Sequence, residues 1–170
     1  MGIGIIICGL NGSGKSTLGK VLSEQLNFHF IDSEHLFFTE KNVYSLTRSH
    51  EEATQILMNE IQQYQNFVLA SVKGEYGKQF LSFINYAIVI DVPKEIRLKR
   101  VQNRDFEKFG KRMLQCGDLY ESQQQFFEMI NSRSENYVEE WLKNINCEVI
   151  KIDGTKPVEE NINYIINCIH

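Results

Sequence analysis

The sequence alternates between short apolar runs and longer segments in which apolar residues recur at every third or fourth position. Short runs that are almost wholly apolar are typical of buried strands. Such runs occupy residues 3–8, 28–31, 67–72, 86–91 and 148–152. The third- and fourth-position spacing predicts amphipathic helices, which we expect near residues 18–26, 48–65, 80–84, 93–101, 126–142 and 158–169.

Strands that alternate with helices favour a parallel sheet covered by helices on both faces. The chain has 170 residues and neither an internal repeat nor a flexible linker, so we expect one domain spanning residues 1–170. Two segments follow neither pattern. Residues 33–47 are irregular, and residues 104–117 are rich in basic side chains with two glycines. The second segment therefore predicts a mobile loop.

The first apolar run leads into a glycine-rich segment. Residues 9–16 read G-L-N-G-S-G-K-S and match the phosphate-loop pattern G-x-x-x-x-G-K-[ST] between a predicted strand and a predicted helix. Such a turn presents backbone N–H groups and the positive end of a helix dipole to phosphates. We therefore expect the chain to bind ATP, with Lys15 on the β- and γ-phosphates and Ser16 on Mg²⁺. The expected nucleotide contacts are Gly9, Asn11, Gly12, Ser13, Gly14, Lys15, Ser16 and Thr17.

The position of this loop defines the fold class and the edge of the sheet that carries the site. A phosphate loop after the first of five strands predicts a three-layer α/β/α P-loop NTPase fold with a five-stranded parallel sheet. In open sheets of this kind, ligands bind at the carboxyl ends of the strands. Asp32 and Glu34 follow the second run directly. Asp32 is expected to serve Mg²⁺ or to accept a proton from a substrate hydroxyl; the alternative is that Asp32 or Ser33 caps a helix.

Arginines after the fourth run form a second group. Arg97, Arg100 and Arg104 are spaced to share one helix face. Guanidinium groups suit a phosphoryl transition state because they offer paired donors to spreading negative charge. We expect Arg104 and Arg112 to act in catalysis together with Lys15 and Asp32. Arg97 and Lys111 are expected at the surface.

Residues 9–17 and the segment Phe30–Glu34 resemble the opening of the shikimate kinase and gluconate kinase group, which belongs with the nucleoside monophosphate kinases. The F-x-D-x-D signature of shikimate kinases is matched with Glu34 in the final place. Weaker similarities cover Arg48–Glu51, Arg104 with Arg112–Leu114, and Arg133–Tyr137. The resemblance implies an acceptor-binding region at about residues 33–65 and a small lid at about residues 104–117. It also implies that adenine lies between Arg104 and the segment Gly154–Pro157.

One departure from shikimate kinases concerns the acceptor. That family follows its third strand with a glycine triplet, whereas this chain has S-V-K-G-E at residues 71–75. Lys73 thus puts a charge where the family has bare backbone, which fits an acceptor phosphate or carboxylate. The acceptor remains open between a shikimate-like hydroxylated metabolite and a nucleoside monophosphate. The residues expected to bind it are Asp32, Glu34, Arg48, Lys73 and Arg133.

Charge and composition bear on the partners, the location and the alternative function of the protein. The formal net charge of −4 at pH 7 gives no electrostatic reason to expect nucleic acid or an anionic membrane as a partner. No apolar run reaches membrane-spanning length and no basic leader opens the sequence, so a cytoplasmic protein is expected. Four scattered cysteines favour reduced thiols. The alternative to a kinase is a regulatory module that binds or hydrolyses ATP and acts through a partner protein. The oligomeric state is left open.

Overall fold

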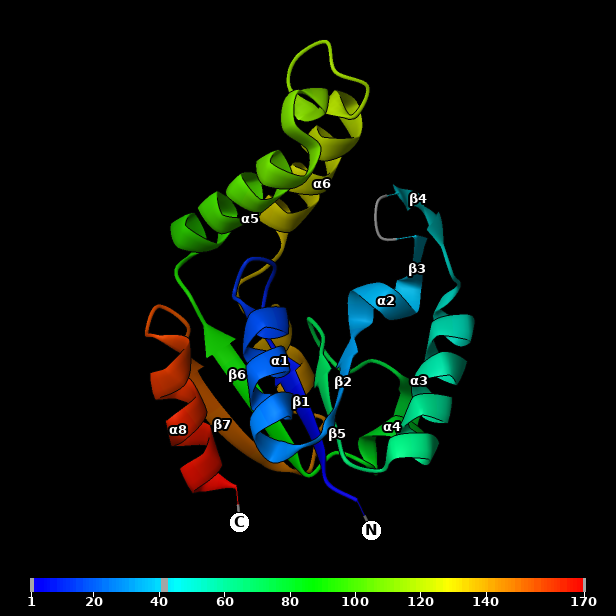
Figure 1. Cartoon of the computed structure of the whole chain (residues 1–170), viewed down its shortest axis with the longest axis vertical. Helices are drawn as coiled ribbons and strands as arrows, with labels where there is room; N and C mark the ends of the chain where they lie inside the picture. Colours follow the sequence, from blue (N-terminus) through cyan, green and yellow to red (C-terminus); the bar gives the residue numbers. More distant parts are fainter. Residues whose placement is uncertain (1, 41–42, 170) are drawn as a thin grey trace.

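The computed structural model describes residues 2–40 and 43–169, and its centre is a five-stranded parallel sheet (Figure 1). The strands are β1 (Gly4–Cys8), β2 (His29–Asp32), β5 (Phe67–Ala70), β6 (Tyr86–Asp91) and β7 (Glu148–Asp153), in the order β2-β5-β1-β6-β7. All five predicted strands are confirmed. Because every pair is parallel, the carboxyl ends of β1, β2 and β5 lie together at one edge.

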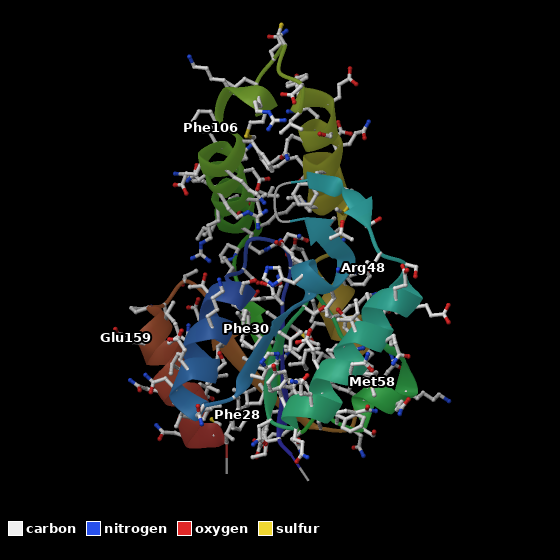
Figure 2. All side chains as sticks on the ribbon, turned by 45° about the vertical axis from the view of Figure 1, so that its right-hand side comes forward. Phe28, Phe30, Arg48, Met58, Phe106 and Glu159 are labelled. Atoms are coloured by element: carbon white, nitrogen blue, oxygen red, sulfur yellow. The ribbon has the colours of Figure 1, made fainter. Side chains whose placement is uncertain are left out.

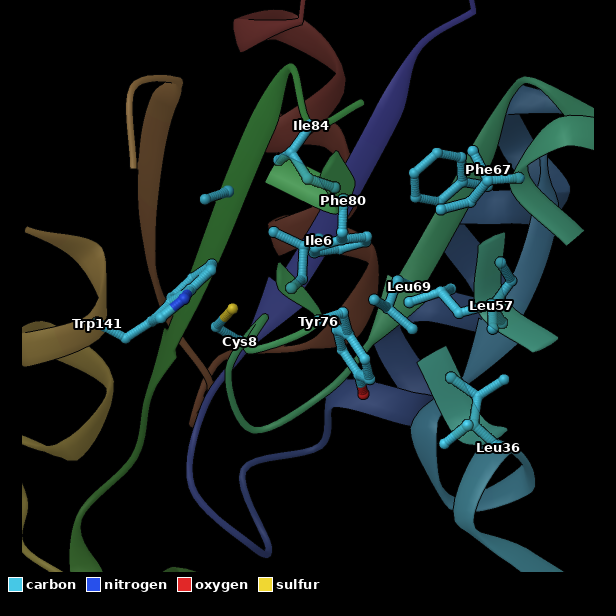
Figure 3. Packing of buried hydrophobic residues seen from close by; sticks show 14 of the residues in the cluster. Ile6, Cys8, Leu36, Leu57, Phe67, Leu69, Tyr76, Phe80, Ile84 and Trp141 are labelled. Carbon is cyan, nitrogen blue, oxygen red and sulfur yellow. The ribbon is translucent and has the colours of Figure 1, made fainter. Parts of the chain in front are cut away.

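Helices cover both faces of this sheet, as the three-layer prediction requires. Helices α1 (Lys15–Leu26) and α8 (Val158–Cys168) pack on one face, and α3 (His50–Tyr64), α4 (Gly77–Leu81) and α7 (Tyr137–Leu142) pack on the other. Successive residues of β1 point to opposite faces. Ile5 and Ile7 therefore join the core under α1, whereas Ile6 and Cys8 join the core under α3. Figure 3 shows Ile6 and Cys8 on that second face.

A helical arm rises from the carboxyl edge of the sheet (Figure 1). It consists of α5 (Lys94–Phe109), the short 3₁₀ turn η1 (Gly110–Met113) and α6 (Tyr120–Ser132). The prediction of a loop over residues 104–117 is wrong for its first part, since helix α5 continues to Phe109. The predicted stripe over residues 126–142 is also not one helix, because α6 ends at Ser132 and α7 begins at Tyr137. Phe126 and Phe127 are half-buried residues of α6 in the helical arm and do not belong to the core around the sheet.

The irregular segment after β2 forms α2 (Ser33–Phe37) and the antiparallel strands β3 (Phe38–Glu40) and β4 (Val43–Thr47). Helix α3 begins where it does because of a capping box. The Ser49 hydroxyl accepts from the Glu52 N–H at 3.1 Å, and the Ser49 N–H donates to the Glu52 carboxylate at 2.8 Å. Strands β3 and β4 form the second arm of the molecule, which faces the helical arm across the carboxyl edge of the sheet (Figure 1).

Within residues 2–40 and 43–169, no helix has both the length and the apolar character needed to span a membrane.

Candidate functional site: a phosphate loop between two arms

The loop between β1 and α1 has the backbone geometry of a phosphate cradle. Gly12 and Gly14 have φ values of 83° and 95°, in the left-handed region that favours glycine. A Cβ on Gly12 would lie 2.3 Å from the carbonyl oxygen of Arg97, so the loop packs directly on the start of the helical arm. Apart from its neighbours in the chain, no described residue has an atom within 4 Å of the position that a Cβ on Gly14 would take. The loop is therefore held against the protein on one side and open on the other.

Two features of the loop fit a bound triphosphate. Within the described residues, no side chain caps the N-terminus of α1, so its first N–H groups are free to meet an anion. The Ser13 hydroxyl is a buried polar atom without a hydrogen-bond partner in the same part of the chain. Ser16 and Thr17 follow in the first turn of α1, and Ser16 is half-buried there.

Lys15 lies at the centre of the site. Its ammonium donates to the Leu10 carbonyl at 3.3 Å. Burial lowers the pKa of Lys15 to about 8, and the charges of Asp32 and Glu34 oppose that shift only in part. Arg104 also acts electrostatically on Lys15. The structure thus brings four predicted residues together from α1, the end of β2, α2 and α5.

The acceptor-side carboxylates have defined partners. Asp32 is 9% exposed, and its Oδ1 accepts from the Glu34 N–H at 3.0 Å. This contact confirms that Asp32 caps α2, which was the structural alternative to a role with Mg²⁺. Glu34 lies 3.9 Å from the Arg104 guanidinium across the gap between the two arms. The pair links α2 to α5, and both side chains act electrostatically on Lys15.

A cavity of about 230 Å³ opens on the other side of the loop, and its lining residues include Ser13, Gly14, Thr17, Arg100, Gly154 and Asn161. Arg100 Nη2 donates to the Gly154 carbonyl at 3.0 Å. The expected neighbour of Gly154 was Arg104, which instead faces Glu34. The two arginines share one face of α5 one helical turn apart, and each has a different partner, Gly154 for Arg100 and Glu34 for Arg104. Pro157 is the N-cap of α8, next to this cavity.

Two predicted arginines are engaged elsewhere. Arg48 Nη1 donates to the carbonyl oxygens of His35 and Leu36 at 2.9 and 3.1 Å and thereby holds the end of α2, where the strand pair β3–β4 meets α3 (Figure 2). Arg112 pairs with Asp118 at 2.6 Å at the far end of the helical arm, and both side chains are 60% exposed. The structure brings neither arginine together with Lys15.

The prediction that Arg97 lies at the surface is wrong, because its side chain is only 4% exposed. Its Nε donates to the Val92 carbonyl at 3.0 Å, and its Nη2 donates to both carboxylate oxygens of Glu135 at 2.7 and 2.9 Å. The partner lies 38 residues away in sequence, on the return from the helical arm, so local spacing gave no sign of the pair. Arg97 is thus a structural residue at the base of the arm.

Arg133 and Lys73 converge on one aromatic ring. Arg133 Nη1 donates to the Asn11 side chain of the phosphate loop at 2.6 Å. Its guanidinium carbon lies 5.0 Å from the centre of the Tyr137 ring, and Lys73 Nζ lies 3.8 Å from the same centre. Lys73 also pairs with Glu75 at 2.7 Å. Two residues predicted to bind the acceptor therefore share a wall of the site.

Tyr76 is a buried residue beside the candidate site that the sequence analysis did not single out. Its side chain is buried, its hydroxyl lies 3.1 Å from Ser71 Oγ, and its ring stacks on His50 with centres 5.9 Å apart. Burial raises the pKa of the Tyr76 hydroxyl. Asp32 acts on it electrostatically. The sequence feature that could have identified Tyr76 is its position four residues after the third predicted strand, at the carboxyl edge of the sheet.

A five-stranded parallel sheet in this order, with a phosphate loop after its central strand and an arm on each side, defines the P-loop fold of small-molecule kinases. The model of the family described as "AAA domain" matches residues 5–128. The chain belongs to that family.

Curated relatives and solved structures agree with this fold. YqaC of Bacillus subtilis, an uncharacterized protein, is 26% identical, and the match covers 97% of this chain and 96% of that protein. A shikimate kinase of Microcystis aeruginosa is 31% identical over 69% of this chain and 65% of its own length.

Three structures share the fold over at least 97% of this chain and 95% of their own. They are a deoxyadenosine kinase of M. mycoides with bound dATP (TM-score 0.62, 16% identical), a shikimate kinase of Aquifex aeolicus (0.57, 20%) and a gluconokinase of Sinorhizobium meliloti (0.55, 12%). The resemblance to the shikimate and gluconate kinase group is confirmed.

Proposed function

We propose that this protein is an ATP-dependent phosphotransferase that moves the γ-phosphoryl group of Mg·ATP to a small acceptor. The observation that supports this most is the group of charges around Lys15, where Asp32, Glu34 and Arg104 meet from three separate elements. A site that only holds a nucleotide needs the phosphate loop alone. Carboxylates and an arginine beyond the γ-phosphate end supply what a transfer reaction needs in addition.

Each residue then has a defined task. Lys15 and the loop N–H groups hold the phosphates, and Ser16, with Asp32 acting through water, would hold Mg²⁺, which neutralises charge on the β- and γ-phosphates when bound. The acceptor hydroxyl oxygen attacks the γ-phosphorus, the bond from that phosphorus to the bridging oxygen breaks, and ADP leaves. The hydroxyl proton passes to the carboxylate of Asp32.

The two sides of the loop are assigned to the two substrates. The cavity beside Gly154 receives the base, with Arg100 over it in place of the expected Arg104. Arg104 faces the γ-phosphate, and closure of the helical arm adds Arg112 and excludes water from the reaction. Asp32, Glu34, Lys73 and Arg133 line the acceptor side. The acceptor is a hydroxylated metabolite of the shikimate or gluconate type or a nucleoside monophosphate.

The test is ADP release from Mg·ATP in the presence of separate acceptors: nucleoside monophosphates, shikimate, gluconate and related polyols. Acceleration by one of them supports the kinase and names its substrate class. A panel in which none accelerates ADP formation, although ATP binds, contradicts the kinase and favours a regulatory ATP-binding module. A pull-down for a protein partner is then the next step.

A further inference from the structure

Arg104 acts electrostatically on Lys15 and has a buried acidic neighbour on α5. Its Nε donates to Asp105 Oδ1 at 3.0 Å, and its Nη2 lies 3.0 Å from the same oxygen. The Asp105 side chain is only 4% exposed, whereas that of Arg104 is 46% exposed. The pair thus connects the interior of the helical arm with a guanidinium at the candidate site.

Adjacent positions on a helix do not make such a contact by default. Their side chains point about 100° apart around the helix axis and do not face each other. Lys94 and Glu95 are also adjacent on α5, yet the Lys94 ammonium donates to the Asn131 carbonyl. Arg104 has to bend back toward its own helix to reach Asp105, so the contact restricts the torsions of its long side chain.

The position of Asp105 is costly for an acid. It belongs to the buried face of α5, with Val101 one turn before it and Phe109 one turn after it. A buried carboxylate lowers stability unless a cation or a hydrogen-bond donor compensates its charge. An apolar side chain would fill this position without that cost. Stability alone therefore does not account for an acid here, and the contact with Arg104 requires another explanation.

Asp105, and not Glu34, determines the direction of the Arg104 guanidinium. Two donors meet one buried oxygen at 3.0 Å, and charge-assisted hydrogen bonds are the stronger kind. The Glu34 carboxylate lies 3.9 Å from Arg104 Nη1 and its side chain is 51% exposed, so this second pair contributes little. Nε and Nη2 form one edge of the planar guanidinium. With that edge on Asp105, Nη1 is directed toward α2.

We propose that Asp105 is a positioning residue for phosphoryl transfer, which holds the Arg104 guanidinium in the direction that the transferring phosphate requires. The inference rests on the proposed phosphotransferase function and adds a residue that acts through Arg104 and not on a substrate. An arginine that is already oriented stabilises the charge of the transition state without first losing torsional freedom. Without Asp105, the same side chain samples many torsions.

The first experiment measures kcat and the Kd for ATP with the acceptor that the panel identifies. Asp105→Asn keeps the shape of the side chain and removes its charge. We expect kcat to fall roughly tenfold to a hundredfold, with little change in the Kd for ATP. Glu107→Gln is the matched control, because it removes the same charge from an exposed position on α5. Equal kcat values for the two variants would overturn the proposal.

A double-mutant cycle tests whether Asp105 acts through Arg104. In the Arg104→Ala background, a further Asp105→Asn substitution should leave kcat unchanged, because the side chain that Asp105 orients is absent. If the two losses multiply instead, Asp105 acts by another route and the proposal fails.

NMR of the guanidinium separates this inference from the proposed function. The Nε–H of Arg104 is observed in protein saturated with Mg²⁺ and a non-hydrolysable ATP analogue, so no phosphate is transferred. We expect this proton to exchange with water roughly tenfold faster in Asp105→Asn than in the wild type or in Glu107→Gln, because its hydrogen bond to a buried carboxylate is lost. Equal exchange in all three proteins contradicts the inference. A protein in which Asp105 slows this exchange but which phosphorylates no acceptor contradicts only the proposed function.

Discussion

Lys15 is a half-buried cation and Arg97 a buried one, and the protein compensates their charges differently. Arg97 donates to both oxygens of Glu135, so its charge is satisfied within the fold. Among the described residues, no carboxylate lies within 4 Å of the Lys15 ammonium, which donates to the backbone carbonyl of Leu10. An uncompensated cation at the start of a helix favours a ligand that carries negative charge.

This contrast gives a first prediction. Lys15→Ala abolishes phosphoryl transfer because the β- and γ-phosphates lose their cation, while the fold persists since the side chain supports no other element. Lys20→Ala is the control, because Lys20 is exposed on the same helix. Activity and circular dichroism are measured for both. Turnover by a folded Lys15→Ala variant would rule out the assigned role of the loop.

The second prediction concerns pH. The pKa of Lys15 is about 8 in the protein, and a polyphosphate beside the ammonium raises it. Binding therefore takes up a proton above pH 8, and the affinity for ATP falls as pH rises, by up to tenfold per pH unit. Titration calorimetry measures the Kd for ATP between about pH 6.5 and about pH 9.5, a range that spans the pKa of Lys15. Lys15→Arg should remove the dependence; an equal slope in that variant would place the titrating group elsewhere.

At the scale of elements, the helical arm is joined to the body at its base. Besides Arg97–Glu135, Lys94 Nζ donates to the Asn131 carbonyl at 2.8 Å between the start of α5 and the end of α6. Gly12 of the phosphate loop touches the Arg97 backbone at the same place. The far end of the arm, with exposed Phe106, projects from the body (Figure 2). The arm is thus anchored to the body at its base.

A stability measurement tests that base. Glu135→Ala leaves the buried Arg97 guanidinium without its counter-ion, which we expect to lower the free energy of unfolding by about 2–4 kcal/mol. Glu139→Ala removes an exposed partner of Lys151 and should cost less than about 1 kcal/mol. Urea unfolding compares the two variants. Equal losses would mean that the Arg97–Glu135 pair does not hold the arm.

Arm closure is tested at Arg112. If closure brings this arginine onto the transferring phosphate, Arg112→Ala lowers kcat by about a hundredfold with little change in the Kd for ATP. Lys111→Ala is the matched control, since it removes an adjacent exposed charge. Equal kcat values for the two variants would contradict a role of Arg112 in the transfer step and leave it only as the partner of Asp118.

At the scale of the whole molecule, the parts that local pattern specifies were predictable. The five strands are continuous apolar runs because helices bury them on both faces, and the loop after β1 has a fixed sequence pattern. Helix α5 was cut short in the prediction because the buried face of its outer turns includes the charged residue Asp105 beside Val101 and Phe109, so the sequence shows no continuous apolar stripe there. The β3–β4 pair was missed because residues 38–47 are short and mixed in character.

Residues defined by distant partners could not be predicted. Arg97 meets Glu135, and Arg133 meets Asn11 over 122 residues. The sequence analysis expected Arg104 beside Gly154, but Arg100 contacts it. Which of the two arginines reaches Gly154 depends on the direction of α5, and residue spacing alone does not determine that direction. Tyr137 was noted as part of a motif, but its contact with two cations needs the loop after β5 and the end of α6 to come together.

The central claim is that the γ-phosphoryl group goes to a small molecule. The most direct measurement follows the label from γ-labelled ATP in a reaction with each member of the acceptor panel. We predict that the label appears in one of these acceptors and that Lys15→Ala forms no labelled product. Label found only in inorganic phosphate, at a rate that no acceptor changes, would contradict the account.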